Sequence, residues 1–374
     1  LEGLEMKPFG MIVFGLLLFC KVGTAAGQEV KSNPAKPEDM AKAVAAAREK
    51  GLTWLAKNQA ADGSWGKTFT IATTSFACLS YLAASDEPYT QDRGKVLIKG
   101  LNFLIANQQD GTFKTQAGNW IHSQGFATLA LSEAYGRSLF CKTKPDMDMK
   151  KVRSIVAGAV QAIAKNQSTS GGWWYVPGSP GQHEGSTTVC AVQAIVSAQN
   201  YGIEIDEKVL NNGFEYLKKC QSPDGGFNYQ QGDGTSMKEG TAAAVATLGL
   251  MKKFDFGVMI NGYKFLLKIT PAAISAERFP YYGHFYGSMA MQLLGQEYKE
   301  DKEFREKTAG YIAGVHKDLL SWQAPDGTWP IKGAHFQSTG QEATGYATAF
   351  ATLVLEVPEA RLSIFNREPP KVNK

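Results

Sequence analysis

The residues with the clearest capacity for chemistry are a histidine and three tyrosines close to position 284. These residues are Tyr281, Tyr282, His284 and Tyr286. They follow Pro280, a residue that suits the first turn of a helix. Tyr282 and Tyr286 are four residues apart and share a helix face, with His284 offset from them. A histidine between tyrosines can act as a general base beside a phenolic acid, although hydrogen-bonded burial in the core fits the same pattern.

Two glutamates lie near the starts of predicted helices in the middle of the chain. Glu184 precedes a stretch of small residues that begins at 185, and Glu239 precedes a similar stretch from 241. A carboxylate at a helix N-terminus is stabilised by the helix dipole, and this structural role is the simpler interpretation. A carboxyl group near a histidine and a phenol can also transfer protons. We therefore treat His284, Glu239 and Tyr282 as the candidate catalytic residues.

A run of aromatic residues precedes Glu184. Trp173, Trp174 and Tyr175 are followed by a loop rich in proline and glycine, and then by His183. Such a platform can stack on an apolar or sugar ligand, although one tryptophan also fits a repeated motif of the chain. His122 stands at the start of another predicted helix. The predicted ligand-binding residues are Trp174, Tyr175, His183, Glu184, Tyr281, Tyr286 and His122.

Charge and cysteine spacing argue against several other kinds of site. The net charge is +4 and no block of five or more like charges occurs, so a nucleic-acid surface is not expected. The five cysteines lie far apart, without a CxxC pair or a histidine at zinc-finger spacing. We expect buried thiols in a helical core, no metal site and no cofactor.

A motif with a period of about fifty residues recurs along the chain. Its marker is a glutamine followed by a glycine-containing turn and an aromatic residue, and the glutamines are Gln59, Gln108, Gln167, Gln221 and Gln323. They are separated by 49, 59, 54 and 102 residues, and the last interval is two periods. A degenerate copy near Gly262, without the glutamine and the Asp-Gly, fills that gap and completes six copies.

We call the glutamine, turn and aromatic residue of one copy a clasp. A charged amphipathic helix is expected to end at the glutamine, and glycine permits the turn that follows because it accepts positive φ. We expect the glutamine amide to satisfy N–H groups at the start of the next helix, shielded by the aromatic residue. That next helix is built from small and apolar residues and must be buried. Six such hairpins predict an all-α (α/α)6 toroid with an inner ring of small-residue helices.

The clasp is similar to the QW-type repeat of terpenoid cyclases and protein prenyltransferase β subunits over residues 40–357. More closely, the chain resembles exported bacterial proteins of the planctomycete type, described as prenyltransferase/squalene-oxidase-repeat or terpene cyclase-like proteins. The segments that carry this resemblance are 125–136, 171–175, 220–227, 281–286 and 362–367. The resemblance implies the toroid fold, but a fold hosts many functions, so function must be argued from the site.

The catalytic motifs of the characterised relatives are absent from this sequence. Class II terpene cyclases use an Asp-x-Asp-Asp acid, and the nearest equivalent, residues 237–240, keeps only Glu239. The zinc ligands of protein prenyltransferases are not reproduced, since Cys190 lies two residues out of place and His284 one residue off. Aspartate pairs that bind a diphosphate are also missing. The one Asp-x-Asp, Asp146 and Asp148, lies in a connector between hairpins, where a solvated loop is the simpler interpretation.

These observations favour a binding protein. We expect an apolar, isoprenoid-like ligand or a protein partner in a central cavity lined by Ala, Thr, Tyr and Phe, with Glu239 and His284 near one end. The alternative is an enzyme of unassigned mechanism related to isoprenoid cyclases or transferases. A polysaccharide lyase is less favoured, because polyuronate substrates need basic side chains and the inner helices hold almost none.

The N-terminal residues resemble an export signal. Met6 and Lys7 precede an apolar run from Phe9 to Cys20, and small residues follow at 24–27. The run is shorter than the roughly 20 apolar residues that a membrane helix needs. We expect a signal peptide with upstream residues over 1–27, a disordered segment over 28–38, one toroid domain over 39–358 and a C-terminal tail over 359–374. The mature protein is then exported, periplasmic or secreted, without a membrane span.

Overall fold

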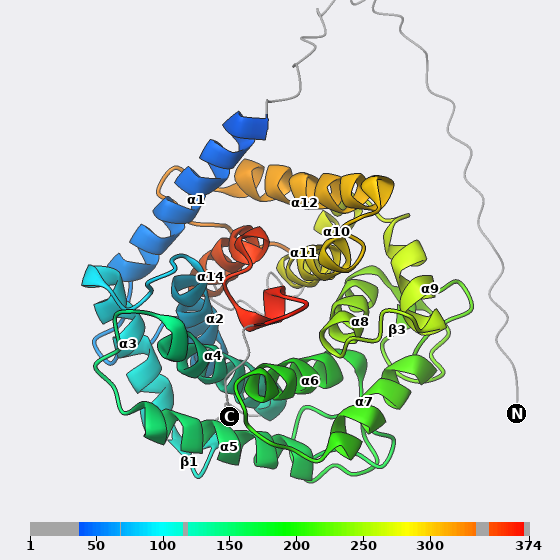
Figure 1. The fold of residues 1–374 in the computed structure, drawn as a ribbon, viewed down its shortest axis with the longest axis horizontal. Helices are drawn as coiled ribbons and strands as arrows, with labels where there is room; N and C mark the ends of the chain where they lie inside the picture. Colours follow the sequence, from blue (N-terminus) through cyan, green and yellow to red (C-terminus); the bar gives the residue numbers. More distant parts are fainter. Residues whose placement is uncertain (1–36, 68, 115–118, 334–343, 370–374) are drawn as a thin grey trace, which may run out of the picture.

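The computed structural model describes residues 37–67, 69–114, 119–333 and 344–369. The predicted signal peptide (1–27) and residues 28–36 of the segment predicted to be disordered lie outside these ranges. Within the described ranges, the chain forms twelve helices of ten or more residues, arranged as two concentric rings (Figure 1). The first helix begins at Pro37, two residues before the predicted start of the domain.

The inner ring is made of α2 (Thr70–Ala83), α4 (Trp120–Phe140), α6 (Gly185–Asn200), α8 (Lys238–Leu250), α11 (Pro280–Glu297) and α14 (Thr344–Glu356). Each helix contacts the next in this order, and α14 contacts α2, so the ring is closed (Figure 1). Every residue of α2 from Ile71 to Ala83 is buried, as expected for a helix surrounded by protein. Small residues allow close approach: a Cβ at Gly125 of α4 would lie 2.5 Å from Cys190 Sγ of α6.

The outer ring is made of α1 (Pro37–Lys57), α3 (Gln91–Ala106), α5 (Met149–Lys165), α7 (Glu207–Lys219), α9 (Gly257–Leu266) and α12 (Lys302–Trp322). These helices are amphipathic. In α5, for example, Val152 and Val156 are buried while Lys150 and Lys151 are exposed. Outer and inner helices alternate along the chain, which confirms the predicted (α/α)6 toroid. In the described ranges, no helix combines the length and apolar character needed to cross a membrane.

Four clasps join neighbouring repeats through the glutamine amide. Gln59 Nε2 donates to the carbonyl of Gly63 in its own turn and to the carbonyl of Val96 in α3, both at 3.0 Å. The equivalent bonds run from Gln167 to Gly171 and Val209, from Gln221 to Gly225 and Val258, and from Gln323 to Gly327 and Ala47. The expectation that the amide accepts from helix N–H groups is therefore wrong. A primary amide nitrogen carries two protons and here bridges two carbonyl groups.

The aromatic residue of the clasp ties the outer helix to the inner one. Trp65 is buried, and its indole Nε1 donates to the carbonyl of Leu55 at 2.8 Å. Its backbone N–H donates to Thr74 Oγ1 of α2 at 3.1 Å. The same two bonds are made by Trp173 with Ile163 and Thr188, and by Trp329 with Leu319 and Thr348. Indole groups with satisfied N–H donors can be buried without a polar penalty.

The second clasp departs from this pattern. Its turn forms a small antiparallel pair, β1 (Gln108–Gln109) with β2 (Thr112–Phe113). Gln108 donates only to Ile105 of the preceding helix α3. Gln124 of α4, in contrast, donates to the carbonyls of Gly111 and Ala159 at 2.7 and 3.3 Å. Gln124 thus makes the bridge between repeats that the clasp glutamine makes elsewhere. A second pair, β3 (Phe227–Asn228) with β4 (Ser236–Met237), begins at the aromatic residue of the fourth clasp.

The degenerate fifth repeat carries a short helix, α10 (Pro271–Ser275), where a clasp would stand. Ser275 Oγ donates to Asp318 Oδ2 of α12 at 2.6 Å and lies 3.0 Å from His284 Nε2 of α11. Since Ser275 has one hydroxyl proton and gives it to Asp318, His284 Nε2 is the donor in the second bond. This network links α10 and the inner helix α11 of the fifth hairpin to α12, the outer helix of the sixth hairpin, in place of the missing glutamine.

The C-terminal segment lies across one end of the ring (Figure 1). It contains two short 3-10 helices, η1 (Val357–Glu359) and η2 (Ser363–Phe365), and Leu362, Ile364 and Phe365 are fully buried. Ser363 donates its backbone N–H and its hydroxyl to the buried carboxylate of Glu133 in α4, at 2.9 and 2.6 Å. Over its described residues, the predicted tail is therefore packed onto the inner ring.

Candidate functional site

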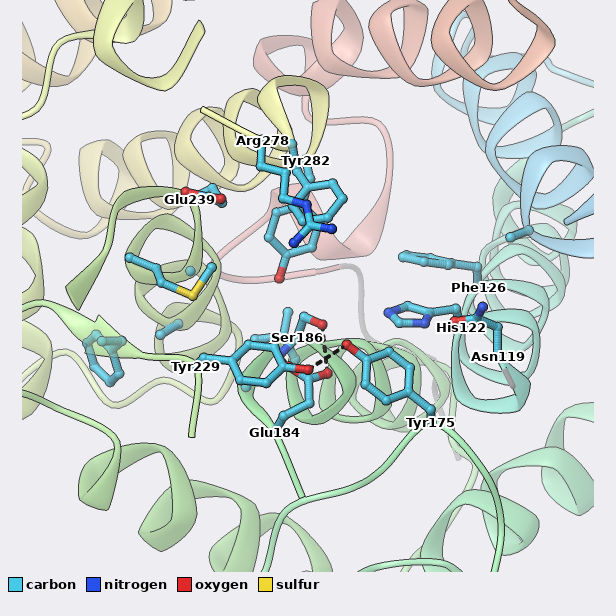
Figure 2. Close-up of a pocket in the computed structure, with 18 of the residues that line it drawn as sticks. Asn119, His122, Phe126, Tyr175, Glu184, Ser186, Tyr229, Glu239, Arg278 and Tyr282 are labelled. Atoms are coloured by element: carbon cyan, nitrogen blue, oxygen red, sulfur yellow. Dashed lines mark hydrogen bonds between the residues drawn. The ribbon is translucent and has the colours of Figure 1, made fainter. Parts of the chain in front are cut away.

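A cavity of about 810 Å³ opens where the inner helices begin (Figure 2). All six inner helices contribute lining residues from their first two turns, because they run in the same direction and their N-termini meet at this end. Segments between the helices add further lining residues, including Tyr175, Tyr229 and Arg278, and Leu217 of the outer helix α7 also lines the cavity. The volume lies within the range of roughly 300–1,000 Å³ that is typical of small-molecule sites.

Three phenylalanines form an apolar floor to the cavity. Phe76, Phe126 and Phe350 each stand six residues after the first residue of their helix, α2, α4 and α14. The ring centroids of Phe76 and Phe126 are 4.4 Å apart, and those of Phe76 and Phe350 are 4.2 Å apart. Val189 and Ala244 also belong to the apolar lining. An aromatic cluster of this kind binds apolar groups by excluding water from a large area.

The cavity wall at the N-terminus of α6 is polar. Glu184 caps this helix and accepts hydrogen bonds from the backbone N–H groups of Ser186 and Thr187, at 2.7 and 2.5 Å. Ser186 Oγ donates to the same carboxyl group at 2.7 Å. Burial raises the pKa of Glu184, while these three donors oppose that effect. In front of them, the hydroxyls of Tyr175 and Tyr229 are hydrogen-bonded to each other at 2.9 Å (Figure 2).

His122 lines the cavity from the first turn of α4. Its ring centroid lies 5.6 Å from that of Tyr175 and 6.2 Å from that of Phe126. Burial lowers the pKa of His122 to about 4, so the imidazole is neutral at pH 7. The structure therefore places a neutral hydrogen-bonding ring between the polar wall and the apolar floor.

Glu239 lines the opposite side of the cavity from the first turn of α8 and is 4% exposed (Figure 2). Burial raises the pKa of Glu239, and the nearby Glu277 adds to this effect, whereas Lys238 and Arg278 oppose it. Lys238 itself forms an ion pair with Glu277 at 2.5 Å. Glu239 is thus a carboxyl group that holds a proton more tightly than usual at the edge of an apolar cavity.

Tyr282 reaches from α11 into the cavity, with its hydroxyl directed towards α6 (Figure 2). Its ring packs edge-on against Tyr286, with centroids 4.6 Å apart. The hydroxyl oxygen is buried and has no hydrogen-bond partner among the described residues. Burial raises the pKa of Tyr282, so the phenol stays protonated at neutral pH. The structure brings this residue, Glu239, Glu184, Tyr175 and His122 together around one cavity.

Two other candidate tyrosines do not line the cavity. The Tyr286 hydroxyl donates to Gln193 Oε1 of α6 at 2.7 Å, and the whole residue is buried. The Tyr281 hydroxyl donates to the carbonyl of Pro330 at 2.6 Å. Both hydroxyls are therefore used in linking neighbouring elements of the ring.

Trp174 and His183 also lie away from the lining of the cavity. The Trp174 ring packs edge-on against Tyr175, with centroids 5.0 Å apart. His183 Nδ1 lies 3.1 Å from the hydroxyl of Tyr216. Of the predicted aromatic platform, Tyr175 is the member that lines the cavity, and Trp174 packs against it.

His284 is not among the residues that line the cavity, which corrects the expectation that it stands, like Glu239, near one end of the cavity. The side chain is fully buried between the rings of helices, where it contacts Ser275 and packs against Trp322 with centroids 5.4 Å apart. Burial lowers the pKa of His284 to about 3. Its position two residues after Tyr282 turns it towards α12, so one helix sends the two side chains in different directions.

Several lining residues were not among the sequence candidates. Phe76, Phe126 and Phe350 each precede an alanine at the same position of three inner helices, and this recurring Phe-Ala pair was visible in the sequence. Ser186 and Tyr229 carried no comparable signal, because their roles depend on neighbours from other repeats. In the described ranges, no group of three or more His, Cys, Asp or Glu side chains is placed to hold a metal ion.

Solved structures of two kinds of toroid are similar to this chain. The type II terpene cyclase MstE from Scytonema, without ligand, has 14% identity and a TM-score of 0.53 over 86% of this chain and 100% of the cyclase chain. A complex of an MstE variant with merosterolic acid A has 13% identity and a TM-score of 0.55 over 87% and 99%. The GH76A alpha-1,6-mannanase from Salegentibacter sp. HEL1_6 has 10% identity and a TM-score of 0.61 over 86% and 100%. At these identities the likeness concerns the fold alone.

The sequence comparisons point to one family. No curated protein sequence matches the chain. The family model of the prenyltransferase alpha-alpha toroid domain matches residues 36–212, 188–268 and 261–370, which include all of the described helices. This protein therefore belongs to the prenyltransferase alpha-alpha toroid domain family.

Proposed function

We propose that this protein binds an apolar, isoprenoid-like small molecule in the central cavity. The observation that carries the proposal is the cavity of about 810 Å³ floored by Phe76, Phe126 and Phe350. The three phenyl rings offer a large apolar area and no hydrogen-bonding groups, which suits the hydrocarbon part of such a ligand. The structures of MstE variants with geranylgeranyl dihydroxybenzoate and merosterolic acid A show that a related toroid accommodates such molecules.

Carbohydrate chemistry is less well supported by the lining residues. The inactive mannanase variant lacks two adjacent aspartates, and the present sequence contains no two consecutive aspartates. Arg278 is the one arginine or lysine among the described residues that line the cavity. A polyuronate lyase would need more basic side chains to neutralise its substrate.

The binding test uses geranylgeraniol as the probe and the folded full chain. We expect saturable binding by isothermal titration calorimetry, and loss of binding in Ala244→Phe, which fills the cavity at its floor. Ala46→Phe on the exposed face of α1 is the matched control and should bind like the unmodified protein. Native mass spectrometry of the purified protein should also detect a bound lipid. An unmodified protein that is folded but binds no probe and carries no lipid contradicts the proposal; co-purification with another chain would instead indicate a protein partner.

Proton-transfer chemistry on the bound isoprenoid is a second candidate function. The observation that favours it is Glu239, a buried carboxyl group of raised pKa on the cavity lining, with the Tyr282 phenol on the same cavity. A protonated carboxyl in an apolar site can act as a general acid. Glu239→Gln should then bind geranylgeraniol normally but lose the conversion that the unmodified protein shows by gas chromatography. This candidate function is ruled out if the unmodified protein and Glu239→Gln form equal amounts of product, or if neither forms any.

Export of the mature protein is proposed from the apolar run between Phe9 and Cys20 and the small residues at 24–27. Expression of the full chain in an exporting bacterium, followed by N-terminal sequencing, tests this proposal. A mature chain that begins near residue 27 or 28 outside the cytoplasm supports it, and an uncleaved chain in the cytoplasm contradicts it.

A further inference from the structure

Three hydroxyl groups line the cavity together at the N-terminus of α6. Tyr175 and Tyr229 share one hydrogen bond, and Ser186 donates its proton to Glu184 (Figure 2). A hydroxyl oxygen has two lone pairs, so these groups keep acceptor capacity after their internal bonds are made. This hydroxyl cluster, Tyr175, Tyr229 and Ser186, is therefore ready to accept a hydrogen bond from a molecule in the cavity.

A hydroxyl group that lacks a hydrogen-bond acceptor lies on the other side of the ring of inner helices. The Tyr282 hydroxyl is directed towards α6, is buried, and has no partner among the described residues (Figure 2). Its ring is held against Tyr286, whose own hydroxyl is fixed by Gln193 at 2.7 Å. A buried donor without a partner is costly, and such groups in native proteins usually meet a ligand or an ordered water.

We propose that the ligand carries a hydroxyl group, bound between Tyr282 and the hydroxyl cluster, with its apolar body on the phenylalanine floor. The inference rests on the proposed binding function and narrows its ligand class to apolar alcohols. Tyr282 donates to the ligand oxygen, and the ligand O–H donates to an oxygen of the cluster. A hydrocarbon satisfies neither partner, and an ether satisfies only Tyr282.

The test compares three probes of the same carbon skeleton: geranylgeraniol, its methyl ether and the corresponding C20 hydrocarbon. Titration calorimetry on the full chain should give tighter binding of the alcohol than of the ether by about threefold to tenfold, the usual worth of one hydrogen bond. The ratio of alcohol to ether affinity should shrink towards one in the double variant Tyr175→Phe/Tyr229→Phe. If that double variant does not fold, Ser186→Ala takes its place. Tyr282→Phe should weaken alcohol and ether alike and leave the hydrocarbon unchanged.

The outcomes separate this inference from the proposed function. Equal affinity of the unmodified protein for all three probes overturns the hydroxyl site and leaves apolar binding intact. Absence of binding for every probe contradicts the proposed function itself. Tyr81→Phe is the matched control, since its hydroxyl donates to the carbonyl of Leu52 and it does not line the cavity. An alcohol preference that this control variant also loses would contradict the assignment to the hydroxyl cluster.

Discussion

A buried histidine whose contacts are a hydroxyl and an indole ring has little capacity to carry charge. His284 donates from Nε2 to Ser275, and its Nδ1 has no partner among the described residues. The nearest carboxylate in this network, Asp318, is reached only through Ser275. The residue therefore acts as a structural link between the fifth and sixth hairpins, and other side chains are left to carry the chemistry of the cavity.

Acid should destabilise the fold through this histidine. The pKa of His284 is about 3 in the folded protein and 6.5 without burial, so the folded state favours the neutral imidazole. The associated stability is present above pH 6.5 and is lost as the pH falls towards 3; at pH 5 the loss is about 2 kcal/mol. Urea unfolding at pH 7 and pH 5 should show a loss in the unmodified protein, to which His122 also contributes, and a loss smaller by about 2 kcal/mol in His284→Gln. The same pH dependence in both proteins would contradict the assignment.

At the scale of the elements, the clasp glutamine works by bridging carbonyl groups of two repeats. In the second repeat, the glutamine at the motif position makes no such bridge, and Gln124 of the following helix makes it instead. Gln124 also accepts from the Phe113 N–H at 3.0 Å and is fully buried. In this repeat, Gln108 therefore occupies the motif position, while Gln124 bridges the two repeats.

Two matched substitutions test this division of roles. Gln124→Ala leaves buried carbonyl and N–H groups without partners and should lower the free energy of unfolding by about 3 kcal/mol. Gln108→Ala, at the motif position, loses a bond to Ile105 of the preceding helix and one accepted from Gly111, and should cost about 1 kcal/mol. Urea denaturation gives both values. A larger loss in Gln108→Ala would show that the motif position still carries the bridge.

For the whole molecule, stability depends on closing the ring between its first and last repeats. The last clasp supplies one link, from Gln323 to the carbonyl of Ala47 in α1. A second link joins Arg48 of α1 to Glu356 at the end of α14, at 3.1 Å. Burial raises the pKa of Glu356 to about 8 even though Arg48 and Arg361 lie beside it. The ring is therefore closed around a carboxyl group that ionises only at alkaline pH.

Removing Arg48 should weaken the closure most at alkaline pH. The folded pKa of Glu356 lies above its ordinary value of 4.5, so the stability tied to its protonation is lost as the pH rises through 8. Arg48→Ala should cost about 1 kcal/mol at pH 6 and at least about 2 kcal/mol at pH 9, where an ionised Glu356 has lost one partner. Arg93→Ala, whose partner Glu49 is exposed, is the control and should cost about 0.5 kcal/mol or less. A pH-independent loss in Arg48→Ala would contradict this account.

The repeat architecture follows from local sequence alone. Glycine-containing turns after each glutamine, charged outer helices and small-residue inner helices recur at a regular interval, and each of these features reports on its own segment. Stacking such hairpins until the ring closes requires no knowledge of individual contacts. For the same reason Glu184, Glu239, Tyr175 and His122 could be named in advance, because helix starts in such a ring face one common end.

Only the tertiary structure decided which side chains enter the cavity and which are used between the rings. Tyr282 and His284 stand on one helix, yet the packing of α11 against α8 and α12 sends the first inward and the second outward. Gln124 replaces Gln108, and the C-terminal segment closes one end of the ring through Glu133, because of contacts between residues distant in sequence. Helix rotation and long-range pairing are set by the fit of all neighbours at once, and a local pattern holds no information about them.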